Sequence, residues 1–122
     1  MAVRKVLCVD DVASDLLNIE KIVSASGVFV STASNGKDAV AKAINEMPDL
    51  IFMDVNMPVM DGFAAMRELK KDAGAKNIPV VLVTSKNQKA DKMWAQVQGA
   101  SGYVTKPYTA EQIHAQLKAL SF

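Results

Sequence analysis

Three short runs of consecutive apolar residues constrain the fold more than any other feature of the chain. They span residues 6–9, 50–53 and 80–83. None of them alternates apolar with polar residues, as a strand with one solvent-exposed face would, so they are typical of strands buried on both faces. Weaker strands are expected at residues 28–30 and 102–104. The pattern predicts a sheet that lies in the interior of the molecule.

Segments with helical spacing separate and follow these runs. Their apolar residues recur three or four positions apart, as on a helix with one apolar face. Strand and helix therefore alternate five times, which predicts an α/β fold with an open, doubly wound parallel sheet. Ser34-Asn35 and Thr109 are expected helix N-caps. The expected apolar positions are Leu16, Ile19, Ile22 and Val23; Val40, Ala43, Ile44 and Met47; Phe63, Met66 and Leu69 within a helix over residues 62–71; Ala90, Met93, Trp94 and Val97; and Ile113, Leu117 and Leu120.

The composition is that of one ordinary soluble domain. The chain has 122 residues, half of them apolar, which is enough for one hydrophobic core. Lysine and arginine (14) nearly balance aspartate and glutamate (13), and no basic block supplies the charge that nucleic-acid binding requires. No apolar run approaches the ~20 residues that cross a bilayer, and the N-terminus is not a signal peptide. With a single cysteine, we expect a cytoplasmic domain over residues 1–122 without an internal disulfide or an output domain.

Polar side chains follow four of the expected strands, directly where each strand ends. The carboxyl ends of parallel strands meet at one edge of the sheet, where ligands bind in such folds. Clustered carboxylates require a cation, and oxygen ligands favour Mg²⁺ beside phosphate. An aspartate can attack phosphorus and form an aspartyl phosphate, while an ammonium and a hydroxyl bind the phosphoryl oxygens. The residues at this edge are Asp10 and Asp11, Asp54, Thr84 and Lys106.

These residues and their spacing resemble the response-regulator receiver domain, the CheY-like family. The resemblance spans essentially the whole chain. It is carried by the Asp10-Asp11 pair, the motif MDVNMPVMDG around Asp54, Thr84, and the TKP motif that ends at Pro107. It implies a flavodoxin-like sheet of five parallel strands in the order 2-1-3-4-5, with five helices. It also implies a cis peptide bond before Pro107.

The resemblance implies a role for each residue of the site. Asp54 is the expected phosphoacceptor, and Lys106 and Thr84 are expected to bind the phosphoryl group. Thr84 and Tyr103 are the expected switch residues, because Thr84 moves toward the phosphoryl group and Tyr103 turns into the space that it leaves. The expected ligands of Mg²⁺ are Asp10, Asp11, Asp54 and the backbone carbonyl of Asn56.

The resemblance also implies a function in two-component signalling. The chain is expected to be a stand-alone response regulator that takes a phosphoryl group from a histidine kinase or a phosphotransfer domain. It then presents a changed face, made of the fourth helix, fifth strand and fifth helix, to a protein partner, or serves as a phosphate sink. We expect a monomer that binds neither nucleic acid nor membrane. The stretch TSKNQKADKMWAQVQGASGYVTKP, residues 84–107, is similar to PilH-type regulators of the chemosensory systems that control type IV pili and twitching motility.

Other functions fit parts of this pattern. Enzymes that form an aspartyl phosphate, phosphatases or phosphotransferases, also place an aspartate after a strand, but they normally carry a second acid where this chain has Asn56. A flavin- or nucleotide-binding domain would have a glycine- or hydroxyl-rich loop where this chain has VDDVASD. A receiver that never takes phosphate is a further alternative, although the set of site residues is complete. The sequence favours a signalling receiver that catalyses only its own phosphorylation and dephosphorylation.

Residues around the site are expected to tune it or to serve the core. Asn56 and Lys86 border the expected path of the hydrolytic water, so we expect them to set the phosphate lifetime. Trp94 is interpreted as partly buried packing, or as an interface anchor if it is exposed. Cys8 is expected to be an inert core thiol, and His114 an exposed residue without a catalytic role.

Overall fold

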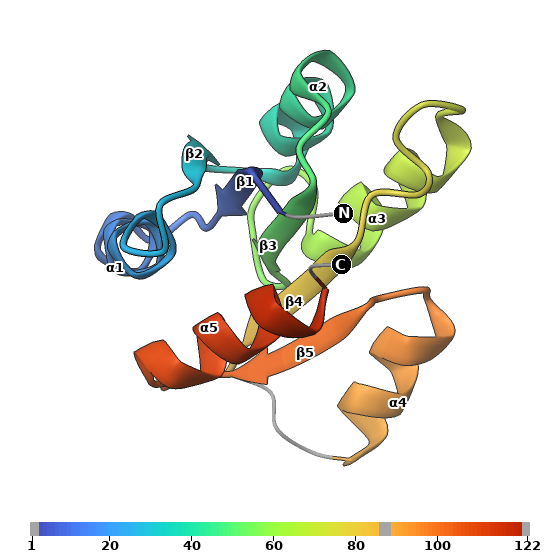
Figure 1. Cartoon of the computed structure of the whole chain (residues 1–122). Coiled ribbons are helices and arrows are strands. Elements are labelled where there is room, and N and C mark those ends of the chain that lie inside the picture. Colours follow the sequence, from blue (N-terminus) through green and yellow to red (C-terminus); the bar gives the residue numbers. More distant parts are fainter. Residues whose placement is uncertain (1–2, 86–88, 121–122) are drawn as a thin grey trace.

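A computed structural model describes residues 3–85 and 89–120, in which five strands alternate with five helices. The strands form one parallel sheet in the order β2-β1-β3-β4-β5 (Figure 1). This confirms the α/β doubly wound fold and the strand order. The elements are β1 (Lys5–Val9), α1 (Ala13–Ser24), β2 (Phe29–Ala33), α2 (Gly36–Glu46), β3 (Leu50–Asp54), α3 (Gly62–Lys71), β4 (Val80–Thr84), α4 (Lys89–Val97), β5 (Gly102–Thr105) and α5 (Ala110–Ala119).

The central strands β3 and β4 are buried along their whole length. Both extend one residue beyond the apolar runs that predict them. Asp54 pairs with Val83, and Thr84 pairs with Thr105, so the parallel ladder continues through these polar residues. The sequence places Asp54 and Thr84 just after their strands, but strand pairing makes them the last residues of β3 and β4. Their side chains are thereby held in the rigid part of the sheet.

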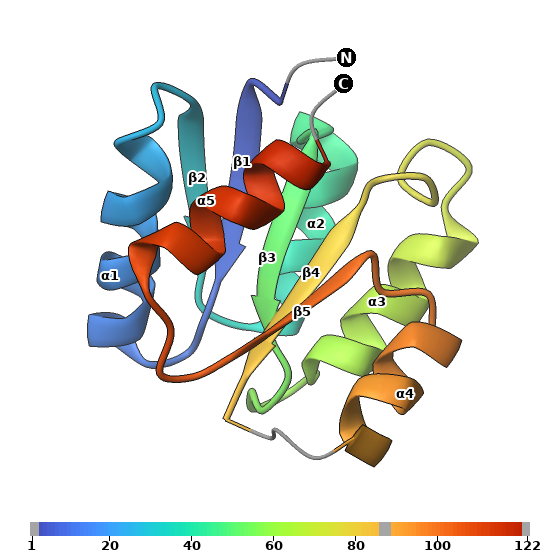
Figure 2. The same cartoon turned by 60° about the horizontal axis from the view of Figure 1, so that its bottom comes forward.

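Helices cover both faces of the sheet (Figure 2). Helices α1 and α5 pack on one face, and α2, α3 and α4 pack on the other. Successive side chains of a strand point to opposite faces, so a strand between two helical layers needs apolar residues at consecutive positions. Among the helices of the described segments, none combines the length and apolar character of a membrane span. The strand residues facing α1 and α5 include Val6, Cys8, Leu50 and Phe52, and those facing the other layer include Leu7, Val9, Ile51 and Met53.

Three helices begin at side chains that cap their free backbone N–H groups. Such caps satisfy donors that have no partner within the helix. The expected caps Asn35 and Thr109 are confirmed, and Asp61 is a third. Asn35 accepts a hydrogen bond from the Asp38 N–H, Asp61 from the Ala64 N–H and Thr109 from the Gln112 N–H.

The apolar stripe predicted for α4 is not buried, and this prediction was wrong. Met93 is 57% exposed, Trp94 53% and Val97 75%, whereas the small residue Ala95 is buried. The Trp94 ring nevertheless makes an edge contact with Phe63 at a centroid distance of 6.4 Å. Helix α4 approaches the core through a small side chain, and its larger apolar residues face outward. The same correction applies in part to the stripe predicted for α2, because Ile44 and the residue that follows the helix, Met47, are exposed.

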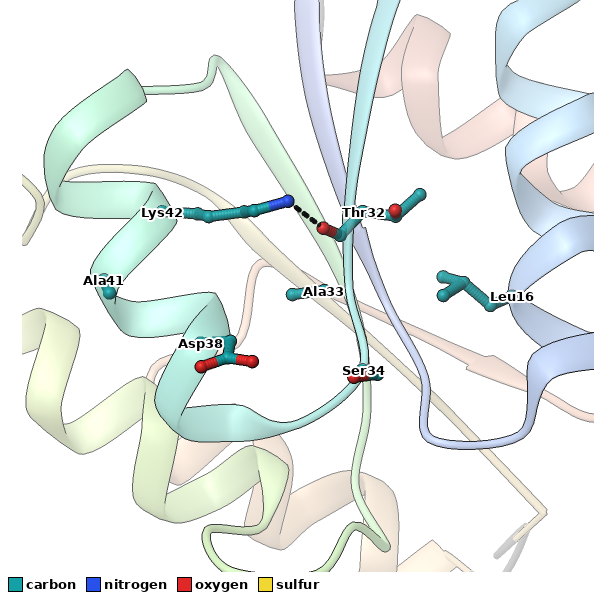
Figure 3. A pocket seen from close by; sticks show the side chains of 7 residues that line it. All are labelled: Leu16, Thr32, Ala33, Ser34, Asp38, Ala41 and Lys42. Atoms are coloured by element: carbon teal, nitrogen blue, oxygen red, sulfur yellow. Dashed lines mark hydrogen bonds between the residues drawn. The ribbon is translucent and has the colours of Figure 1, made fainter.

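The strand β2 lies at one edge of the sheet and pairs only with β1. An edge strand has backbone groups without a partner strand, which makes it a template for pairing with other chains. Here the Lys42 ammonium, from α2, donates a hydrogen bond to the Thr32 carbonyl oxygen (Figure 3). Lys42 and Thr32 line a surface hollow together with Leu16 and Asp38. A charged side chain therefore covers part of this edge.

Candidate functional site

The carboxyl ends of four strands bring the predicted site residues together. Asp10 follows β1, and Lys106 follows β5, while Asp54 and Thr84 end β3 and β4. The strands are parallel, so these ends and the loops that follow them lie at one edge of the sheet (Figure 2). Within residues 3–85 and 89–120, the buried polar side chains are Asp10, Asp54 and Thr84, and all of them belong to this edge.

Asp10, Asp11 and Asp54 form a cluster of carboxylates. One oxygen from each residue lies within 4.8 Å of the others. Asp10 is held in place because its Oδ1 accepts a hydrogen bond from the Val12 N–H at 3.0 Å. Asp11 is exposed, so the cluster is reachable from solvent. An all-oxygen donor set of this kind fits a hard divalent cation such as Mg²⁺.

The Lys106 ammonium reaches into this cluster from the end of β5. Its Nζ lies 2.8 Å from Asp10 Oδ2, 3.0 Å from Asp15 Oδ2 and 3.6 Å from Asp54 Oδ2. Lys106 thus forms an ion pair with Asp54, but two shorter contacts hold the ammonium on other acids. Sequence reasoning missed Asp15. Its signal is an acid one helical turn after Asp11, which becomes informative only once the start of α1 is known.

Burial and neighbouring charges act in opposite directions on the Asp54 carboxyl group. Burial raises its pKa above the ordinary value of aspartate, the Lys106 ammonium lowers the pKa, and the Asp10 carboxylate raises it. Hydrogen bonds from the backbone N–H groups of Val55 and Asn56 also lower it. Burial prevails, so the pKa of Asp54 is raised. A nucleophilic, ionised Asp54 therefore depends on positive charge beside it.

Lys106 keeps its charge at this edge. Burial lowers its pKa, but the hydrogen bonds from the ammonium to Asp10 and Asp15 outweigh that effect, and the pKa stands above the ordinary value of lysine. Among the described residues, the salt bridges at this edge join the Lys106 ammonium to Asp10, Asp15 and Asp54, and Asp11 adds a fourth carboxylate to the cluster. This excess of acids favours a further cation at the edge, which agrees with the oxygen donors available there.

Thr84 and Tyr103 lie on neighbouring strands. Thr84 is fully buried at the end of β4. Tyr103 is partly buried, pairs with Leu82 in the ladder between β4 and β5, and packs against the core. Burial raises the pKa of the Tyr103 phenol, and the Asp91 carboxylate of α4 adds to this. The peptide bond between Lys106 and Pro107 is cis.

Asp61 and Gly62, the last two residues of the MDVNMPVMDG motif, pack the start of α3 against the strand that carries Asp54. The Gly62 N–H donates to the Val55 carbonyl oxygen at 2.8 Å. A Cβ atom on Gly62 would lie 2.3 Å from the Asp54 carbonyl oxygen, so a side chain has no room there. The Asp61 carboxylate accepts a hydrogen bond from the Ala64 N–H at 2.8 Å and starts the helix. The motif therefore supports Asp54 through the backbone.

The remaining residues singled out in the sequence lie elsewhere. Cys8 is buried, and burial, with a smaller contribution from the Glu20 carboxylate, raises the pKa of its thiol to about 12, which makes it the inert thiol predicted. His114 is exposed on α5, where its Nε2 lies 3.0 Å from the Ile22 carbonyl oxygen. A carbonyl only accepts hydrogen bonds, so Nε2 is the donor. Lys86 lies outside the described residues.

Comparison with known proteins agrees with this site. Residues 6–118 match the response regulator receiver domain. Protein PilH of Pseudomonas aeruginosa is 40% identical over 116 residues, which make up 95% of this chain and 96% of PilH. The structure of the chemotaxis protein CheY4 of Vibrio cholerae is similar, with a TM-score of 0.90, 33% identity and coverage of 98% of this chain and 99% of CheY4.

A further similar structure contains a metal ion. The receiver domain of the sensor histidine kinase PA1611 of Pseudomonas aeruginosa, with a magnesium ion coordinated in its active-site cleft, has a TM-score of 0.89 and 26% identity, and the match covers 98% of each chain. Fold, site residues and sequence matches thus agree along nearly the whole chain. The chain belongs to the response regulator receiver domain family of two-component signalling.

Proposed function

We propose that Asp54 accepts a phosphoryl group from a phosphohistidine of a histidine kinase or phosphotransfer domain, with Mg²⁺ as cofactor. The observation that carries this proposal is the buried Asp54 carboxylate, which lies within an acid cluster and 3.6 Å from the Lys106 ammonium. Burying charged groups at a sheet edge lowers stability unless they are paired. An arrangement of this kind is typical of a site that performs chemistry.

In the proposed reaction, an Asp54 carboxylate oxygen attacks the phosphorus atom. The new O–P bond forms as the P–N bond to the partner's histidine breaks, and the electron pair returns to the imidazole. Lys106 and Thr84 then bind the oxygens of the phosphoryl group. Asp10, Asp11, Asp54 and the backbone carbonyl of Asn56 would hold Mg²⁺, which when bound offsets the negative charge of the phosphoryl oxygens.

Phosphorylation adds about −1.5 to −2 charges beside a fully buried hydroxyl. We infer that Thr84 moves toward the new oxygens and that Tyr103 turns inward, which changes the face formed by α4, β5 and α5. Three exposed apolar residues of α4 offer a protein partner an apolar surface to bind, namely Met93, Trp94 and Val97. A partner that prefers one state of this face would shift the population of states.

The similarity to PilH and to a chemotaxis protein supports a role in chemotaxis-like signalling that controls type IV pili and twitching motility. The chain would act there as an output regulator or as a phosphate sink, as a cytoplasmic monomer that catalyses only its own phosphorylation and dephosphorylation. Asn56 supports this over an enzyme that forms an aspartyl phosphate, because it stands where such an enzyme normally has its second acid.

Intact-mass spectrometry after incubation with acetyl phosphate tests the proposal. Wild type should gain the mass of one phosphoryl group in the presence of Mg²⁺ and should gain none without it. Asp54→Asn should gain none, because an amide cannot form the acyl phosphate. Asp61→Asn is the matched control, since Asp61 lies on the loop that follows Asp54 but caps α3, and asparagine is an equally good N-cap.

The result that contradicts the proposal is equally clear. A phosphoryl adduct on Asp54→Asn would show that another residue accepts the group. The absence of an adduct on wild type and on Asp61→Asn, with rapid quenching and saturating Mg²⁺, would remove phosphoryl transfer from the functions of this edge.

A further inference from the structure

The Lys106 ammonium is shared unequally among the acids around it. Asp10 and Asp15 bind it at 2.8 Å and 3.0 Å, while Asp54 lies at 3.6 Å. The first two distances are those of charge-assisted hydrogen bonds, and the third is that of an ion pair without one. The ammonium is therefore drawn toward β1 and α1 and away from the residue that would carry the phosphoryl group.

Asp15 differs from Asp10 in how it is held. The Asp10 carboxylate is buried and bonded to the Val12 N–H, so its position is fixed by the end of β1. Asp15 stands in the first turn of α1, where the helix dipole stabilises a negative charge. Its side chain is 43% exposed, and that of Lys106 is 19% exposed. The contact between them lies near the surface, where it can open without disturbing the core.

We propose that Asp15 is a positioning residue that holds Lys106 away from Asp54 and so weakens the binding of a phosphoryl group there. The inference rests on the proposed function of Asp54. To bind an oxygen of a group on Asp54, the ammonium must lengthen or lose its contact with Asp15. Asp15 therefore stabilises the free site relative to the site that carries an anion.

A second effect acts in the same direction. The Asp15 and Asp54 carboxylates lie 3.0 Å and 3.6 Å from the same ammonium nitrogen, so an anion on Asp54 would add negative charge near that of Asp15. Like charges at such distances repel, more strongly where the site is partly desolvated. Replacing Asp15 by the neutral, isosteric asparagine removes the repulsion and weakens the competition, because an amide oxygen accepts a weaker hydrogen bond from an ammonium than a carboxylate does.

Beryllium fluoride is a suitable probe, because a carboxylate oxygen reversibly replaces one ligand of the beryllium and becomes its fourth ligand beside three fluorides, which gives a tetrahedral anionic adduct. Its dissociation constant can be measured by ¹⁹F NMR at saturating Mg²⁺, after the Mg²⁺ affinity of each variant has been measured separately. Asp15→Asn should bind beryllium fluoride about threefold to fivefold more tightly than wild type, which is the size of effect expected for a partly exposed ion pair.

Two variants distinguish positioning from a general effect of charge or structure. Asp15→Glu keeps the carboxylate and should stay within about twofold of wild type. Asp38→Asn removes an acid from the first turn of the neighbouring helix α2, where Asp38 accepts a hydrogen bond from the Asn35 side chain instead of contacting Lys106. Asp38→Asn should therefore bind beryllium fluoride with the affinity of wild type.

The outcomes separate this inference from the proposed function. Equal affinities of wild type and Asp15→Asn, or an equal gain in Asp38→Asn, would overturn the role of Asp15 and leave the function of Asp54 intact. Weaker binding by Asp15→Asn would also overturn it, since Asp15 would then support the anion. If wild type itself binds no beryllium fluoride at saturating Mg²⁺, the proposed function fails, and the inference fails with it.

Discussion

The carboxyl edge of the sheet and the outer face of α4 depart from the usual distribution of side chains in opposite ways. The edge buries Asp10 and Asp54, which are charged groups, whereas α4 exposes Met93, Trp94 and Val97, which are apolar. An exposed apolar side chain loses nothing relative to the unfolded chain, so α4 is tolerated without compensation. A buried carboxylate loses its hydration and needs hydrogen bonds and a counter-charge, which Lys106 provides. The side chains at the edge are thus stabilised by specific partners, whereas the apolar side chains of the α4 face need none to stay exposed.

The largest expected effect contrasts α4 with its neighbour α3, which packs on the same face of the sheet. Met66 of α3 is fully buried, so Met66→Ala should lower the free energy of unfolding by about 3 kcal/mol through lost burial and a cavity. Met93 of α4 is exposed, so the same substitution there should change it by less than about 0.5 kcal/mol. Urea unfolding measures both, and similar losses would mean that the outer face of α4 is covered in solution.

The second prediction tests the counter-charge at the edge. Lys106→Met leaves Asp10 and Asp54 buried without their ammonium, so it should lower the free energy of unfolding at pH 7 by about 2 kcal/mol, less than for a fully buried pair because Lys106 is partly exposed. The loss should shrink in acid, where the carboxyl groups protonate. Lys71→Met is the control, since the ion pair of Lys71 with Glu68 is exposed and should contribute almost nothing.

The pH dependence of this contribution follows from the raised pKa of Lys106. A group whose pKa is higher in the folded state stabilises that state below its ordinary pKa, ~10.4 for lysine, as long as its acidic partners stay ionised. The stabilisation by Lys106 should therefore be complete at neutral pH and should be lost only as alkaline pH rises through the raised pKa. A wild-type advantage over Lys106→Met that disappears between pH 6 and 8 would contradict the ion-pair geometry.

The smallest expected effect is a gain in the free energy of unfolding, whereas the substitutions above lower it. The pKa of Asp54 is raised by burial, so ionised Asp54 destabilises the folded state, and Asp54→Asn should raise the free energy of unfolding at pH 7 by less than Lys106→Met lowers it. The gain should vanish below the ordinary aspartate pKa of 3.8, where the wild-type carboxyl is protonated in both states. Asp49→Asn is the control, because the Asp49 carboxylate accepts hydrogen bonds from the Arg4 and Lys5 N–H groups and its removal should give no gain.

The contrast also shows where prediction from sequence succeeds. The three central strands β1, β3 and β4 were predictable because a strand between two helical layers needs consecutive apolar residues, a pattern that survives in one dimension. The edge strand β2 was predicted less well, since it includes the polar residues Ser31 and Thr32 and extends to Ala33. The carboxyl edge followed from the same alternation, since parallel strands place all their carboxyl ends together. The stripe of α4 misled because helical spacing shows that apolar residues share a face, without showing whether anything covers that face.

The sequence by itself determined the alternation of strands and helices and the meeting of Asp10, Asp11, Asp54, Thr84 and Lys106 at one edge. Those features depend on local periodicity and on the direction of the chain, both of which are written in the order of residues. Only the tertiary structure decided that Asp15 shares the Lys106 ammonium and that Trp94 is half exposed. Both outcomes depend on distances of a few ångströms between segments far apart in the chain. The packing of the helices on the sheet sets those distances.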